Sequence, residues 1–135
     1  MSEVTSYPHR RVLMVSEGLL AVAGFAGAAQ LVSGASTPPV SDVEPLGLST
    51  WVLPGIWLGA SVGIPSAAAA YLAWRRSPHA PNVVLLSSGL LAVELVVQIP
   101  FIGPSPLQAV FGTVALTTAG IAVDARRRGW RKTRR

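Results

Sequence analysis

Four long apolar segments, separated by prolines, glycines and charged residues, leave this chain very few possible folds. They cover residues 12–32, 48–74, 83–102 and 107–123. An α-helix needs roughly 20 mostly apolar residues to cross a bilayer, and it pairs all of its backbone polar groups within its own segment. The sequence therefore predicts an all-α fold, a four-helix transmembrane bundle.

Composition favours lipid as the solvent of these segments. Of the 135 residues, 13% are charged and 50% are apolar, whereas a soluble domain carries about 25% charged residues. A chain this short cannot hide so much apolar surface from water in one core. We expect a multi-pass membrane protein whose main partner is the lipid bilayer.

The start of the chain has a second interpretation. Arg10 and Arg11 before an apolar stretch resemble a secretory signal peptide, and the small residues 33–35 resemble a cleavage site. The stretch is about 20 residues long, however, against roughly 7–15 in a signal peptide. A retained first helix is the preferred interpretation.

The eleven basic residues all fall on one side of a four-span arrangement. Two precede the first span, two join the second span to the third, and seven follow the fourth. Asp42 and Glu44 lie in the opposite loop. Under the positive-inside rule the basic side is cytoplasmic, which places both termini there. The Ala, Val, Gly and Arg bias is typical of a high-GC bacterium.

These features divide the chain into a basic cytoplasmic segment, 1–11, a membrane domain, 12–123, and a basic cytoplasmic tail, 124–135. We expect the tail to fix topology and to contact anionic lipid headgroups, with an aromatic ring dipping into the headgroup layer. Nucleic acid is not an expected partner, because the tail is short and no reading module accompanies it. The tail residues proposed for this role are Arg126, Arg127, Arg128, Trp130 and Arg131.

The second span carries two features that bear on packing. Gly55, Gly59 and Gly63 form one stripe of small residues, which lets helices approach closely in lipid. A contact within the chain is the preferred interpretation, and a homo-oligomer face or a membrane-protein partner is the alternative. Pro65 cannot donate to the carbonyl of Ser61, so we expect a kink there.

Two carboxyl groups lie inside spans and require partners, because a charge in hydrocarbon costs at least about 2.5 kcal/mol. Glu17 follows the first arginines. Pairing with arginine is its preferred interpretation, and a ligand or proton site is the alternative. Glu94 lies deeper, one helical turn before Gln98, and Gln108 opens the next span across a short turn. We expect these three to gather as one polar cluster. It is either a structural network or a site for a ligand's polar head or a proton.

Other kinds of site are not indicated. The chain has no cysteine and its two histidines lie far apart, so no metal site or cofactor is expected. No sequence motif of a metalloprotease, a serine hydrolase or a phosphate-binding loop is present, so no enzymatic activity is expected.

Some of these residues resemble a known group. The chain is similar to small bacterial four-helix membrane proteins, DoxX-like in size and layout. This resemblance implies a four-helix bundle in the bacterial plasma (inner) membrane, and it implies no activity. The residues that carry it are Pro54, Gly55, Gly59, Gly63, Glu94, Gln98, Leu107 and Gln108. Small multidrug transporters also have four spans and a carboxylate in the first, but the long 33–47 loop and the one-sided charge argue against them.

Three functions remain open at the level of sequence. The first is a non-enzymatic accessory or interaction protein. The second is a transporter or lipophilic-ligand-binding protein that uses Glu94. The third is a holin-like pore former, which small size and a basic tail allow.

Overall fold

The computed structural model describes residues 7–35, 37–102 and 105–130, with the backbone alone for 100–102. Within them the chain is helical and has no strand. The elements are α1 (Arg10–Ser33), the short 3-10 helices η1 (Val40–Asp42) and η2 (Glu44–Leu46), α2 (Val52–Leu58), the π-helix η3 (Gly59–Gly63), α3 (Ile64–Trp74), α4 (Ala80–Ile102) and α5 (Pro106–Arg127). Because α2, η3 and α3 form one continuous span, four helices are long and apolar enough to cross a membrane. Over the described residues, the predicted all-α fold with four helices of membrane-spanning length is confirmed.

Large apolar side chains cover the outside of the bundle. Leu116 is 77% exposed, and Leu19, Val22 and Val96 are about two-thirds exposed. Contiguous apolar surface on this scale would drive a water-soluble monomer to associate. It is the surface expected of helices that face lipid.

The fourth helix, α5, begins with a capping box. Ser105 is the N-cap, its hydroxyl accepts from the Gln108 backbone N–H, and the Gln108 side chain accepts from the Ser105 backbone N–H. Pro106 occupies the first helical turn, where its missing N–H is harmless. This reciprocal capping fixes Gln108 at the start of α5.

The glycine stripe of the second span packs against α1. A Cβ atom on Gly63 would lie 2.8 Å from the Phe25 ring, and one on Gly24 would lie 2.9 Å from the backbone nitrogen of Gly63. A Cβ on Gly55 would lie 2.9 Å from the side chain of Leu31. The stripe is therefore covered by α1, within the same chain.

The second span passes Pro65 through a π-helix instead of a break. The residue after η3, Ile64, donates its backbone N–H to the carbonyl of Gly59, five residues back. Pro65 then falls in the first turn of α3, where no N–H is needed. The wider π turn of Gly59–Gly63 accommodates the proline where we expected a kink.

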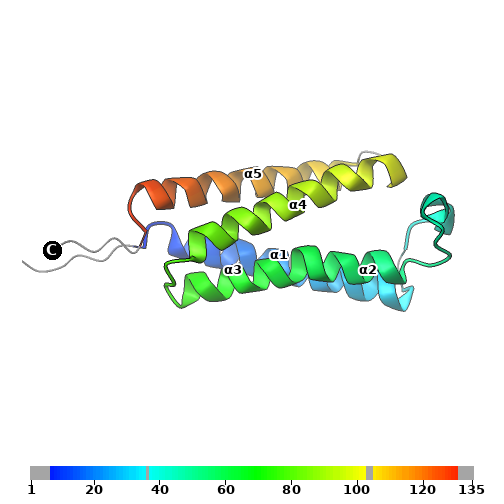
Figure 1. Cartoon of the computed structure of the whole chain (residues 1–135), viewed down its shortest axis with the longest axis horizontal. Coiled ribbons are helices and arrows are strands. Elements are labelled where there is room, and N and C mark those ends of the chain that lie inside the picture. Colours follow the sequence, from blue (N-terminus) through cyan, green and yellow to red (C-terminus); the bar gives the residue numbers. More distant parts are fainter. Residues whose placement is uncertain (1–6, 36, 103–104, 131–135) are drawn as a thin grey trace, which may run out of the picture.

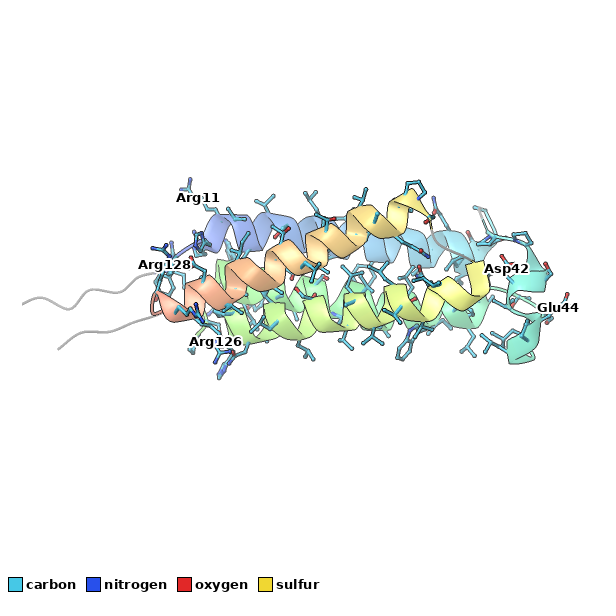
Figure 2. All side chains as sticks on the ribbon, turned by 90° about the horizontal axis from the view of Figure 1, so that it is seen from above. Arg11, Asp42, Glu44, Arg126 and Arg128 are labelled. Carbon is cyan, nitrogen blue, oxygen red and sulfur yellow. The ribbon has the colours of Figure 1, made fainter. Side chains whose placement is uncertain are left out.

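The helices form two pairs, α1 with α2–α3 and α4 with α5, as Figure 1 shows. The pairs lie close together at the end where α3 joins α4, and they diverge toward the end that carries η1 and η2. Figure 2 places Arg11, Arg126 and Arg128 at the first end, and Asp42 and Glu44 at the second. We call these the arginine end and the loop end.

Candidate functional site: a chamber beside Glu94

Where the helix pairs diverge, the bundle encloses two adjoining cavities of about 680 and 360 Å³. We call them together the chamber. The larger lies between α1, α2, α4 and the loop, and the smaller lies between α1, α4 and α5. Both are mainly apolar, and both are lined by Gly27, Gln30, Leu58, Glu94 and Gln98. Ligand sites in proteins commonly have volumes of about 300–1,000 Å³, apolar walls and few polar groups.

Glu94 is held in place by two donors at the boundary of the cavities. The Trp57 indole N–H donates to Oε2 at 2.5 Å, and the Gln98 side-chain amide donates to Oε1 at 3.2 Å. Trp57 belongs to α2, and Gln98 is one turn further along α4, so the carboxyl group links two spans. Its residue is 8% exposed. The predicted proximity of Glu94 and Gln98 is present.

Gln108 lines the smaller cavity, but its side chain has a different role from that of Gln98. Its side-chain carbonyl caps α5, so it does not bond to Glu94. Its Nε2 atom is buried and has no partner, and so is Nε1 of Trp51 in the larger cavity. Two N–H donors beside an apolar chamber thus remain free to bond to a ligand or to water.

Gln30 completes the polar lining, and the sequence interpretation missed it. It lies near the end of α1 and lines both cavities. Its place was open to prediction, because α1, α4 and α5 each begin or end at the arginine end. Gln30, Gln98 and Gln108 lie 18 to 20 residues from the arginine ends of their helices, about 27–30 Å along the axis.

The loop covers the outer end of the larger cavity. Val43, between η1 and η2, is 2% exposed although most of its neighbours are exposed. It lines the larger cavity with Pro38, Leu46 and Leu48. A buried valine inside a polar loop indicates that the loop packs onto the bundle.

Glu17 lies elsewhere, in the closed half of the bundle near the arginine end. It is fully buried, and Ser87 Oγ of α4 donates to its Oε2 atom at 3.1 Å. Ser66 Oγ of α3 lies 3.0 Å from Ser87 Oγ. The preferred interpretation, pairing with arginine, is therefore wrong for the described residues, because the Glu17 side chain points between helices.

The arginine end is closed by contacts between the chain's described ends. Trp130 is 9% exposed, donates its indole N–H to the Ser77 carbonyl at 2.7 Å, and packs edge-on against Tyr7. This corrects the expectation that Trp130 dips into the headgroup layer. Arg131 lies outside the described residues.

Charged side chains at this end also bind protein groups. Arg10 donates to the carbonyl of Trp74 at 3.2 Å, where α3 ends. Asp124 pairs with His9 at 2.7 Å and with Arg128 at 2.6 Å. Arg126 and Arg127 are exposed, so they remain available for lipid headgroups.

Comparison of the chain with protein-family models, with curated proteins and with solved structures finds no match. The resemblance to DoxX-like proteins therefore stays a prediction. Any function must be argued from the chamber itself.

Proposed function

We propose that this protein binds lipophilic cations, with Glu94 as the counter-charge and the chamber as the site for the apolar body. The observation that carries the proposal is the environment of Glu94. Both of its oxygens accept from neutral donors, Trp57 and Gln98. None of the described residues that line the chamber is cationic.

The chemistry follows from these contacts. The Glu94 carboxyl group has two hydrogen-bond donors, but none of the described residues of the mainly apolar chamber supplies a counter-ion. A ligand that brings one positive charge would supply that counter-ion. The indole rings of Trp51 and Trp57, which line the larger cavity, suit a cation as well as an apolar body. A neutral ligand would gain only the apolar contacts.

This function is the lipophilic-ligand alternative of the sequence analysis. It has more support than the accessory-protein interpretation, because α1 covers the glycine stripe that was to bind a partner. No specific observation favours a pore former.

The test is a titration of the full chain in mild detergent with tetraphenylphosphonium, followed by tryptophan fluorescence. Trp51 and Trp57 lie at the chamber, so we expect a saturable change. The variant Glu94→Gln keeps the shape and removes the charge, and we expect its affinity to fall at least tenfold, about 1.4 kcal/mol. Neutral triphenylphosphine oxide should bind both proteins weakly and equally. Equal affinity of the cation for wild type and Glu94→Gln would refute the proposal.

We further propose that the arginine end faces the cytoplasm of a bacterium, in its plasma membrane. The support is the positive-inside rule, applied to arginines gathered at one end and to Asp42 and Glu44 at the other. The chamber then lies in the outer half of the bilayer. Reporter fusions at Val40 and at the C-terminus should lie in different compartments. A shared compartment would overturn this topology.

A further inference from the structure

The carboxyl group of Glu17 has one hydrogen-bond donor where an ionised group needs several. Its Oε2 atom accepts from Ser87, and its Oε1 atom is buried without a partner. Ser87 has a single hydroxyl hydrogen, which it gives to Glu17, so Ser66 is the donor in the Ser66–Ser87 pair. The hydrogen bonds therefore run in one direction, from α3 to α4 to α1.

Over the part of the chain that the structure describes, no positively charged group forms an ion pair with Glu17. Among the described residues, the only ion pairs join Asp124 to His9 and Arg128. The titratable groups on and beside the surrounding helices lie near the arginine end or in the chamber. Several of them contact groups other than Glu17. These are Arg10 of α1 on the Trp74 carbonyl, Arg75 of α3 on Tyr71, Arg76 beside Tyr7, Asp124 of α5 on His9 and Arg128, and Glu94 of α4 on Trp57. Arg11 points away from the bundle in Figure 2, and His79, Arg126 and Arg127 are exposed.

We propose that Glu17, Ser66 and Ser87 form a proton-binding site in which Glu17 carries a proton at neutral pH. A neutral carboxyl group costs far less to bury than a charged one, and Ser87 still donates to its carbonyl oxygen. The site is separate from the chamber and does not depend on the function proposed for Glu94.

The position of the site determines how its proton can exchange. Glu17, Ser66 and Ser87 lie seven or eight residues inside the arginine ends of their helices, about 11–12 Å along the axis. Each comes from a different helix, and all are at most 1% exposed. The proton can therefore leave only when α1, α3 and α4 separate at this level. Proton release is thus coupled to opening of the closed half.

The test is infrared spectroscopy of the full chain in lipid at neutral pH, which detects the carbonyl band of protonated carboxyl groups. We expect such a band in the wild type and its loss in Glu17→Gln. Ser87→Ala should keep the band and shift its frequency, because the hydrogen bond to the carbonyl oxygen is removed. Glu94→Gln is the matched control and should leave the band unchanged. In deuterated buffer, the band should shift far more slowly than backbone amides at helix ends exchange.

Absence of a protonated carboxyl band in wild-type protein at neutral pH overturns the proposal, whether or not any variant folds. A band that persists in Glu17→Gln and disappears in Glu94→Gln also overturns it. Loss of cation binding in Glu94→Gln tests the chamber alone, so the two proposals can fail separately.

Discussion

The two halves of this bundle treat a buried glutamate in opposite ways. At the arginine end the helix pairs are in contact, and Glu17 is fully buried and accepts a hydrogen bond from the Ser87 hydroxyl. At the loop end the pairs diverge, and Glu94 meets two N–H donors at the edge of a chamber. Glu17 is thus sealed between helices in one half, whereas Glu94 lines a cavity in the other. The spacing of the helices thus decides what each carboxyl group can do.

Replacing each buried glutamate by lysine should produce the largest difference in stability between the two halves. Glu17→Lys places an ammonium group in a fully buried position that has no counter-ion among the described residues. We expect a loss of at least about 2.5–3.5 kcal/mol, enough to prevent assembly of a marginal bundle. Glu94→Lys should cost less, because the chamber has room and the amide of Gln98 can turn its carbonyl toward the ammonium.

The measurement is unfolding in detergent, followed by circular dichroism with increasing dodecyl sulfate. Glu94→Lys should remain folded and lose all binding of the lipophilic cation. An equal loss of stability in both lysine variants would contradict the conclusion that the half around Glu17 is closely packed and the half around Glu94 is open.

Adding a methyl group at Gly24, at the border between the two halves, should give the next largest effect on stability. In Gly24→Ala the new Cβ would lie 2.9 Å from the backbone of Gly63, which cannot move aside as a side chain can. We expect a loss of about 1–3 kcal/mol, because α1 must shift away from η3. The control is Gly120→Ala, where nothing lies within 4 Å of the new Cβ. A loss of the same size in both variants would argue against the close approach of α1.

Removing one donor from Glu94 should act on binding more than on stability. Trp57→Phe keeps an aromatic ring beside the chamber and deletes the N–H that reaches Oε2. A hydrogen bond to a charged group contributes about 1.5–3 kcal/mol, so we expect cation affinity to fall roughly tenfold or more. Trp74→Phe, at the arginine end, should leave affinity unchanged. Equal effects of the two substitutions would mean that Trp57 does not position Glu94.

The fold was accessible from the sequence because lipid imposes simple rules on it. Span number and the gathering of arginines at one end follow from segment length and charge, and capping by Ser105 and Pro106 follows from local chemistry. Glu94 and Gln98 share a helix face one turn apart. Each of these inferences uses residues that are close in sequence or lie at the end of a span.

The missed contacts join residues that are distant in sequence. Ser66 and Ser87 reach Glu17 from two other helices, and serine in a span gives no strong signal by itself. Trp57 was read as part of an apolar span, although it binds Glu94 across the bundle. Counting residues from the arginine end would have placed Glu17, Ser66 and Ser87 at one depth. It would not have given helix rotation, which depends on the packing of Gly24 against Gly63.

The smallest effect distinguishes a partnered from an unpartnered serine on the same span. Ser66 Oγ bonds to Ser87, whereas Ser61 Oγ is buried without a partner. Ser66→Ala should therefore cost about 0.5–1.5 kcal/mol, because Ser87 loses a donor and the proton-binding site loses its outermost hydroxyl. Ser61→Ala removes an unpaired polar atom from the interior and should be neutral or stabilising. The same detergent unfolding measurement compares the two. A larger loss of stability in Ser61→Ala than in Ser66→Ala would contradict this expectation. It would mean that the Ser61 hydroxyl has a hydrogen-bond partner and that the boundary between the closed half and the chamber lies elsewhere.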